Sequence, residues 1–251
     1  MDIVQTFYDR LAKDYEKLFA DFNSESENQG KILDKIFNNC GFDKSAKVLD
    51  CASGIGTQSL GLAKLGYKIT ASDISEEALN QARIKAKEAD VNISFNKADF
   101  RALEGVFDYK FDIIIAMDNA LPHMLTKADF TRALKSIYNV TEKDGILVAS
   151  IRDYDKILKE KPSYSPPYIH KTEDGQRVCF QTWEWDENRY KLIQYIIDDD
   201  NGLEVKKYKC EYYAIKRAEF TKILKSIGYK EIKWLKPNES NFYQPIVVAK
   251  K

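Results

Sequence analysis

Metal-binding and disulfide signals are scarce in this sequence of 251 residues. Its four cysteines are scattered, with no Cys-x-x-Cys spacing, and its only histidines are His123 and His170. The sequence therefore offers neither a zinc motif nor the cysteine framework of a small secreted domain. We expect reduced thiols, no metal ion and a cytoplasmic protein.

Net charge and long apolar runs are also lacking. Lysine plus arginine number 39 and aspartate plus glutamate number 39, so the formal charge is zero. A protein that relies on bulk attraction to phosphate is disfavoured, and we do not expect nucleic acid as a partner, although a local basic patch is compatible with this composition. No apolar run approaches the roughly 18 residues of a membrane helix, and residues 1–4 lack the basic start of a signal peptide. No membrane partner is expected.

A third glycine is missing from the one glycine-rich turn. Lys47–Cys51 reads as a short buried strand, Gly54 and Gly56 follow, and Gln58–Leu65 has the apolar spacing of a helix. Glycines let a ligand approach the backbone closely, and the helix N-terminus presents unpaired N–H groups to it. A dinucleotide site would need G-x-G-x-x-G, and Asp50 at the strand end would repel a pyrophosphate but suit an ammonium group. The turn favours a cationic ligand, although an ordinary structural turn has the same pattern.

Acidic residues follow the next two predicted strands at the same relative place. Residues 67–72 form the second strand and lead to Asp73, and residues 91–96 form the third and lead to the pair Asp99–Phe100. Ligands bind where the carboxyl ends of neighbouring parallel strands meet. Asp73 could accept both hydroxyls of a ribose, or serve only the start of the next helix beside Ser75, a good N-cap. The pair Asp99–Phe100 could hold an adenine, or form a loop with one buried aromatic ring.

Two further candidates follow the fourth and fifth strands. Residues 111–116 (FDIIIA) are the clearest buried parallel strand, and His123 lies in the segment after it. Residues 145–151 form the fifth strand, and Arg152 stands at its end. A lone histidine is usually structural, but at a strand end it could accept a proton. Arg152 could grip a carboxylate with a forked pair of hydrogen bonds, or form an ion pair with Asp153, Asp155 or another surface acid.

The N-terminal segment carries many aromatic residues. Residues 3–21 have apolar positions at helical spacing, with Tyr8 and Tyr15 among them. They read as a helix packed on the core or as a lid over a bound cofactor. Residues 23–30 are polar and read as a loop or the start of a helix, and residues 31–39 read as a helix.

The second half of the chain departs from the alternation of strands and helices. Residues 156–168 contain three prolines and read as a loop, and three runs within residues 177–213 alternate apolar and polar residues between turn signals. We predict an α/β fold with a Rossmann-like seven-stranded sheet and an inserted antiparallel β meander. Residues 1–155 and 214–251 would form the core with its N-terminal helical lid, and residues 156–213 an insert that covers the substrate site.

The spacing Asp-x-Ala-x-Gly-x-Gly, from Asp50 to Gly56, resembles the first motif of class I S-adenosylmethionine-dependent methyltransferases. With Asp73 and Asp99 at the next strand ends, this set could hold the ammonium, ribose and adenine groups of one S-adenosylmethionine molecule. A narrower resemblance, to glycine and sarcosine N-methyltransferases, runs over most of the chain. It is carried by residues 50–56 (DCASGIG), 118–123 (DNALPH), 151–158 (IRDYDKIL) and 241–243 (NFY).

The resemblance implies a set of site residues. The cofactor-binding residues would be Tyr15, Asp50, Ala52, Gly54, Gly56, Thr57, Asp73, Ile74, Asp99, Phe100, Met117 and Asn119. Arg152 is similar to the arginine that grips the substrate carboxylate, and Tyr8 and Tyr154 would join it. His123 and Arg152 are the predicted catalytic residues. The family also has an arginine for the cofactor's carboxylate after its aromatic helix, and residues 23–30 contain none.

These observations predict an S-adenosylmethionine-dependent methyltransferase that acts on a small molecule. The favoured reaction is N-methylation of glycine, sarcosine or a related carboxylate-bearing amine. A small-molecule O-methyltransferase and a tRNA or other nucleic-acid methyltransferase are the alternatives. A homo-oligomer is compatible with the sequence.

Overall fold

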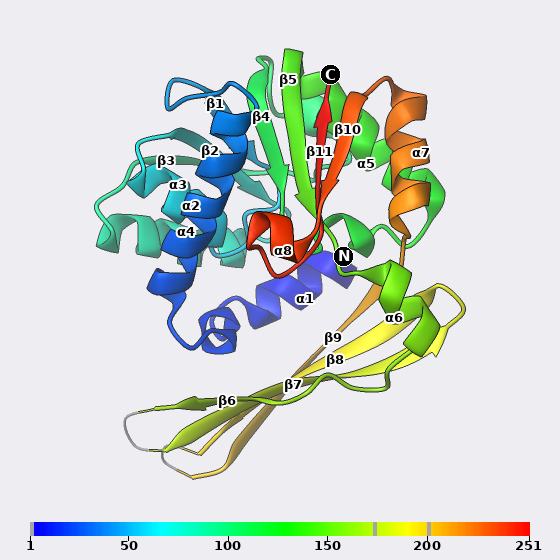
Figure 1. The fold of residues 1–251 in the computed structure, drawn as a ribbon. Helices are drawn as coiled ribbons and strands as arrows, with labels where there is room; N and C mark the ends of the chain where they lie inside the picture. The colour runs from blue at the N-terminus through cyan, green and yellow to red at the C-terminus, as the bar shows by residue number, and fades with distance from the viewer. Residues whose placement is uncertain (1–2, 173–174, 200–201) are drawn as a thin grey trace.

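Two β-sheets organise the chain in the computed structural model, which describes residues 3–172, 175–199 and 202–251 (Figure 1). The larger sheet has the strand order β10-β11-β5-β4-β1-β2-β3. Neighbouring strands are parallel except where β11 pairs antiparallel with β10 and β5. This confirms the predicted Rossmann-like seven-stranded sheet. Its strands are β1 (Lys47–Asp50), β2 (Lys68–Asp73), β3 (Ile93–Lys97), β4 (Phe111–Ala116), β5 (Thr141–Ser150), β10 (Lys230–Leu235) and β11 (Ile246–Lys250).

Helices cover both faces of this sheet, because successive residues of the central strands point to opposite sides. Leu49 and Ile114 share one apolar cluster with α5 and α7, while Val48 and Ile113 share the other with α2 and α3. All four side chains are fully buried, and their transfer from water is the main stabilising contribution to this layer. The main helices are α2 (Phe22–Asn39), α3 (Thr57–Lys64), α4 (Glu76–Glu88), α5 (Lys127–Val140) and α7 (Arg217–Ile227).

Local signals set several helix ends as the sequence predicted. The hydroxyl of Ser75 accepts a hydrogen bond from the backbone N–H of Ala78 and caps α4. Gly228 ends α7 with a φ of 120°, a conformation that favours glycine. The three 3₁₀ turns in the part of the chain that the structure describes are η1 (Tyr15–Leu18), η2 (Leu103–Gly105) and η3 (Leu121–His123).

The N-terminal segment differs from the predicted single helix over residues 3–21. Helix α1 (Ile3–Leu11) ends early and is followed by the short turn η1 (Tyr15–Leu18). The next helix, α2, already begins at Phe22, because the side chain of Asp21 accepts the backbone N–H of Ser24 and caps it. The polar stretch at residues 23–30 is therefore the first part of a long helix and not a loop.

The second sheet is antiparallel and comes from the predicted meander. Its order is β6-β7-β8-β9, one strand more than the sequence suggested. The missed strand β6 pairs with β7, and the missed helix α6 (Tyr154–Glu160) is anchored by the fully buried ring of Tyr154. The prolines at 162, 166 and 167 lie between these two elements and made the whole stretch read as a loop in the sequence. The predicted turn at 199–202 includes residues 200–201, which lie outside the described residues. The strands are β6 (Tyr168–Lys171), β7 (Gln176–Asp186), β8 (Arg189–Asp198) and β9 (Glu204–Tyr213).

Helix α1 lies between the two sheets in Figure 1 and contacts both β9 and α4. Helix α6 leads from β5 towards the meander, and the short helix α8 (Pro237–Ser240) precedes β11. Among the described residues, every helix is too short or too polar to cross a membrane.

Two glycines allow α2 and α3 to cross at very short range. A Cβ atom built on Gly61 would lie 2.0 Å from the carbonyl oxygen of Ser26, and one built on Gly30 would lie 2.6 Å from the backbone of Gly61. Such distances are far inside van der Waals contact, so neither position tolerates a side chain without movement of the helix. The contact fixes α3, whose first turn follows the glycine-rich loop.

We predict that Gly61→Ala destabilises the fold by about 1–3 kcal/mol, because the new methyl group forces the two helices apart. Urea denaturation of purified protein measures this change. The matched control is Gly105→Ala, where a Cβ atom meets nothing within 4 Å. Equal midpoints for the two variants would contradict the close crossing.

Candidate active site

A cavity lies at the carboxyl ends of the central parallel strands. It is framed by the loop after β1, the end of β2 and the segments after β3 and β4. Helix α1 and Tyr15 of η1 complete the lining. The lining includes nine of the twelve residues that the sequence predicted as cofactor-binding: Tyr15, Ala52, Gly54, Thr57, Asp73, Ile74, Asp99, Phe100 and Met117.

The loop after β1 presents its backbone to this cavity. Gly54 has a φ of 52°, and a Cβ atom built on it would meet no protein atom within 4 Å. Because Gly54 lines the cavity, a side chain there would project into space that a ligand needs. Gly56, with a φ of 93°, shapes the turn but does not line the cavity, and a Cβ there would press on Leu60.

Asp50 lies behind this loop. Its side chain is fully buried, accepts hydrogen bonds from the hydroxyl of Ser59 and the N–H of Ala52, and does not line the cavity. Burial raises the pKa of this carboxyl to about 7, against the opposing effect of Ser59. Asp50 thus lies outside the cavity lining in this structure, and its predicted contact with an ammonium group stays a prediction.

Asp73 reaches the cavity at the end of β2. Its two carboxylate oxygens accept the backbone N–H groups of Gly54 (2.8 Å) and Ser75 (2.9 Å). Burial raises its pKa to about 6, although these two hydrogen bonds oppose the shift. Each oxygen keeps a second lone pair, so the group can still accept hydroxyl hydrogen bonds from a ribose.

Asp99 is engaged by a neighbour that sequence reasoning missed. The guanidinium of Arg101 binds both carboxylate oxygens of Asp99, with its Nε 2.9 Å from Oδ1 and 2.8 Å from Oδ2. Both residues line the cavity together with Phe100. Asp99 can therefore accept an amine only through the lone pairs that Arg101 leaves.

A second, larger cavity of about 760 Å³ lies under the meander. It is bordered by α1, η1, α6, strands β7 and β8, and the loop before β11. Three residues line both cavities: Tyr8, Tyr15 and Asp118. These three residues therefore lie at the boundary between the two cavities.

Arg152 projects into this larger cavity. Its Nη2 donates to Oε1 of Gln181 at 3.0 Å, and its guanidinium carbon lies 4.9 Å from the ring centroid of Trp183 and 5.6 Å from that of Tyr212. No ion pair within residues 3–172, 175–199 and 202–251 includes Arg152, and its buried Nη1 has no hydrogen-bond partner. Its positive charge is thus available to an anion.

The acids that follow Arg152 pair elsewhere. Asp153 and Asp155 both bind Arg217, at the start of α7. The alternative in which Arg152 merely pairs with one of these acids is therefore wrong.

The remaining predicted residues lie in supporting positions. Tyr154 is fully buried behind the cavities, where its hydroxyl donates to Oδ1 of Asn119 and contacts the hydroxyl of Tyr190. Asn119 lines neither cavity and also accepts the backbone N–H of Arg152. His123 lines the first cavity but not the second, and its Nε2 lies 2.9 Å from the hydroxyl of Tyr8.

Sequence reasoning did not assign Asp118, which directly follows Met117 at the end of β4. Its carboxylate accepts the hydroxyl of Tyr243 and the amide of Gln58, each at 2.7 Å. The φ angles of Asp118 and Asn119 are 54° and 67°, a left-handed conformation that costs on the order of 1–3 kcal/mol per residue. The sequence did offer one signal, an acid placed after the most apolar strand. It could not show that this acid lies between the two cavities.

Comparison with known proteins supports the sequence motifs. A family model described as a methyltransferase domain matches residues 48–145. The chain is 24% identical over 235 residues to a glycine/sarcosine N-methyltransferase from Aphanothece halophytica, which covers 92% of this chain and 84% of that protein. It is 28% identical over 158 residues to the enzyme of the same name from Parasynechococcus marenigrum (strain WH8102), where the match covers 63% of this chain and about half, 53%, of that protein.

Solved structures share the fold over nearly the whole chain. An S-adenosylmethionine-dependent methyltransferase from Clostridium acetobutylicum ATCC 824 has a TM-score of 0.76, covering 97% of this chain and 98% of that one at 17% identity. An amino pentose methyltransferase from Micromonospora echinaspora, solved with S-adenosylmethionine bound, has a TM-score of 0.73, covering 90% and 91% at 14% identity.

Residues 48–145 are a methyltransferase domain, and the chain has the fold of class I S-adenosylmethionine-dependent methyltransferases. S-adenosylmethionine is its cofactor. The first cavity of the methyltransferase fits that molecule chemically, because Asp73, Asp99 and Asp118 face it while Arg101 is its only lysine or arginine. A molecule with a sulfonium and an ammonium group would offset the charges of Asp73 and Asp118, which have no cationic partner among the described residues, whereas Asp99 is paired with Arg101. The open space above Gly54 would admit the part of S-adenosylmethionine that contacts the backbone of the loop after β1.

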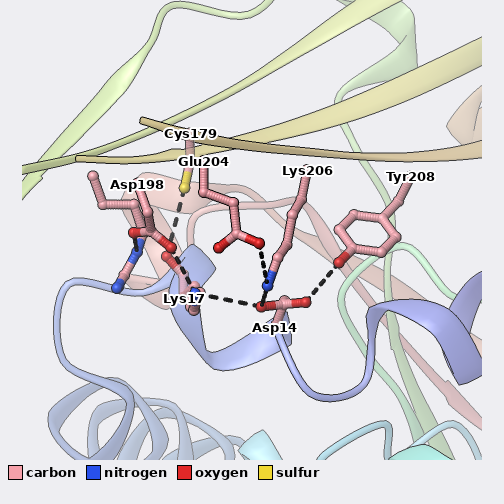
Figure 2. A network of polar contacts seen from close by, with 8 residues as sticks. Asp14, Lys17, Cys179, Asp198, Glu204, Lys206 and Tyr208 are labelled. Carbon is pink, nitrogen blue, oxygen red and sulfur yellow. Dashed lines mark hydrogen bonds and ion pairs between the residues drawn. The ribbon is translucent and has the colours of Figure 1, made fainter. Parts of the chain in front are cut away.

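The segment that contains Asp14 and η1 is tied to the meander by ion pairs and a hydrogen bond (Figure 2). Asp14 accepts hydrogen bonds from Tyr208 (2.6 Å) and Lys206 (3.0 Å), both on β9. Lys17 binds Asp198 at the end of β8 at 2.6 Å. Burial alone would raise the pKa of Asp14, but the hydrogen bonds from Tyr208 and Lys206 outweigh it and hold that pKa below its usual value. The network therefore fixes η1, which carries Tyr15 into both cavities.

The affinity for S-adenosylmethionine should rise with pH. Asp73 has a pKa of about 6, so its ionised fraction increases roughly tenfold between about pH 5 and about pH 7. The ionised form is the better acceptor for ribose hydroxyls, and we expect Kd to fall by up to about tenfold over that range. The stability of the free protein changes in the opposite direction. Because the folded state raises the pKa of Asp73 from its ordinary value of 3.8 to about 6, ionisation of this carboxyl lowers the free energy of unfolding as the pH rises from 3.8 towards 6.

Titration calorimetry at several pH values measures this dependence. Asp73→Asn should bind more weakly at neutral pH and lose most of the pH dependence. An unchanged Kd in this variant at all pH values would exclude a role for Asp73 in cofactor binding.

We also predict that Asp14→Asn loosens the attachment of η1 to the meander. Loss of the charge weakens the contacts to Lys206 and Lys17, and we expect the dissociation rate of S-adenosylmethionine to increase by about two- to fivefold, since partly exposed pairs contribute up to about 1 kcal/mol. Stopped-flow fluorescence checks the rate. Glu16→Gln is the control on the same segment, because Glu16 pairs with Lys85 of α4 and not with the meander. Equal rates in both variants would argue against the network.

Proposed function

We propose that this methyltransferase transfers a methyl group from S-adenosylmethionine to the amine of a small acceptor that carries a carboxylate, such as glycine, sarcosine or a related amino acid. The observation that supports this most is Arg152, a guanidinium in the larger cavity without an ionic partner among the described residues. The relatives named glycine/sarcosine N-methyltransferases support the same acceptor class.

Arg152 is held in a way that suits a carboxylate. Gln181 accepts from Nη2, and the amide of Gln181 is itself oriented because its Nε2 donates to Oε1 of Gln194. The amide of Gln194 donates to the carbonyl oxygens of Phe180 and Tyr195, so its own oxygen must face Gln181. This chain gives Arg152 a neutral partner and leaves its charge for the acceptor.

The methyl donor would supply an electrophilic carbon on a positively charged sulfur. Attack by an amine lone pair needs in-line approach and exclusion of water, and no covalent enzyme intermediate is required. Positioning can contribute up to about 7–11 kcal/mol to such a reaction. Tyr8 and Tyr15 would align the two molecules, and the meander with Trp183 would cover the acceptor.

The size of the larger cavity favours a second candidate. A volume of about 760 Å³ is in the range of pockets that hold drug-sized ligands and far exceeds what glycine fills. An amine larger than glycine, such as an amino sugar or an N-substituted amino acid, would use more of it. The similar fold of an amino pentose methyltransferase is consistent with this candidate.

A screen of acceptors tests the proposal. Release of S-adenosylhomocysteine is measured with glycine, sarcosine, larger amino acids, amino sugars, phenols and bulk tRNA. Turnover with a carboxylate-bearing amine and none with phenols or tRNA is the expected result. Turnover with a phenol or tRNA alone would replace the proposal by one of the two alternatives. Failure to bind S-adenosylmethionine in calorimetry, with NAD as comparison, would remove it.

We predict that Arg152→Ala raises KM for a carboxylate-bearing acceptor by about 10- to 150-fold, because a hydrogen-bonded charge contributes roughly 1.5–3 kcal/mol. Arg152→Lys should recover only part of this, since an ammonium group cannot form the forked contact. The Kd for S-adenosylmethionine should stay unchanged. Arg217→Lys is the control, because the guanidinium of Arg217 already pairs with Asp153 and Asp155. A normal KM in Arg152→Ala would disprove the carboxylate contact.

A further inference from the structure

Asp118 occupies the boundary between the cofactor cavity and the acceptor cavity. Of the three residues that line both, it is the only acid, and the other two are the tyrosines Tyr8 and Tyr15. The predicted base, His123, lines the cofactor cavity only, with Nε2 held against the hydroxyl of Tyr8. Asp118 is therefore better placed than His123 to meet an acceptor that approaches from the larger cavity.

The carboxylate of Asp118 is held in place and still has room for a ligand. Its Oδ1 accepts the hydroxyl of Tyr243 and its Oδ2 accepts Nε2 of Gln58, which is fixed in turn by Oε1 of Gln29. A carboxylate oxygen has two lone pairs, so each oxygen keeps one for a further donor. No lysine or arginine pairs with Asp118 in the part of the chain that the structure describes.

The backbone of Asp118 is fixed by the neighbouring strand end. Its N–H donates to the hydroxyl of Ser150, and the side chain of the next residue, Asn119, accepts the N–H of Arg152. These two hydrogen bonds connect the segment after β4, which carries Asp118, to the end of β5, which carries Arg152. They therefore fix the positions of the two residues relative to each other. Both line the larger cavity, and neither has an ionic partner among the described residues; Glu25 is a second acid of this kind in the lining.

We propose that Asp118 is a catalytic residue that binds the ammonium group of the acceptor and takes its proton before methyl transfer. The proposal rests on the proposed function, since it assumes an amine acceptor. With Arg152 on the carboxylate and Asp118 on the ammonium, the cavity would bind a zwitterion at both charged ends.

The acceptor R–NH₃⁺ gives a proton to Asp118, which yields R–NH₂ and a neutral carboxylic acid. The freed nitrogen lone pair forms the N–C bond while the S–C bond breaks and its electron pair stays on sulfur. The product R–NH₂–CH₃⁺ leaves, and Asp118 loses its proton to solvent. In a site without water, the neutral pair of amine and carboxylic acid is favoured over the ion pair more than it is in solution.

The surroundings of Asp118 suit a group that accepts a proton. Burial raises the pKa of its carboxyl above the usual value, while Tyr243 and Gln58 oppose the shift. This brings the acid closer to the pKa of an amine and makes the transfer less unfavourable. The titratable groups that face it from the surrounding elements are Glu25 of α2, Asp50 of β1, Tyr15 of η1 and Tyr243 before β11.

Asp118→Asn tests the proposal, because asparagine keeps the shape and tolerates the left-handed backbone. With the acceptor found in the screen, we expect kcat/KM near neutral pH to fall by about 10²- to 10³-fold. The deficit should shrink to below about tenfold near pH 10, where the amine is largely unprotonated and needs no base. A residue that only supports the fold would give a deficit that does not depend on pH in this way.

Two further variants complete the experiment. Asp144→Asn is the matched control, because Asp144 also has a left-handed φ, 63°, but pairs with Lys250 away from both cavities. It should behave as wild type. A pH-dependent loss in His123→Gln, with wild-type activity in Asp118→Asn, would overturn the proposal and favour the histidine. Absence of amine methylation by the wild-type enzyme would instead contradict the proposed function.

Discussion

Buried carboxylates without cationic partners dominate the chemistry of this protein. The parallel arrangement of β1, β2 and β4 brings three strand ends to one edge of the sheet, and each carries an acid there or directly after it: Asp50, Asp73 and Asp118. Burial raises the pKa of each, and their mutual repulsion adds to the effect at Asp50. A positively charged methyl donor relieves that strain, so the arrangement is most stable when the donor is bound.

Of these three acids, only Asp118 lines the larger cavity that contains Arg152. Arg152 stands at the end of β5 and projects under the meander, where a fixed glutamine and aromatic rings surround it. Tyr8, Tyr15 and Asp118 line both cavities. The segment that carries Tyr15, tied to the meander through Asp14 and Lys17, therefore forms part of the boundary between them.

Much of the fold followed from local patterns in the sequence. The strand at 111–116, the helix that Ser75 caps and the seven-stranded sheet needed only hydrophobic periodicity and capping signals. Hydrophobic periodicity was misleading for short helices and strands that depend on partners distant in sequence. Helix α6 is anchored by Tyr154 against Tyr190, and strand β6 exists only because β7 offers it hydrogen bonds. Neither contact leaves a periodic trace in residues 154–171.

The sequence by itself determined the class of ligand, because the order of glycines and acids at successive strand ends is a local property of the chain. It placed Gly54 and Asp73 at a cavity that fits S-adenosylmethionine. Only the tertiary structure decided which side chains face that cavity. Asp50 and Asn119 have the right spacing but turn into the interior, while Asp118 reaches both cavities. The physical reason is that the direction of a side chain after a strand depends on hydrogen bonds from other elements, here from Ser59 of α3 and from Gln58 and Tyr243.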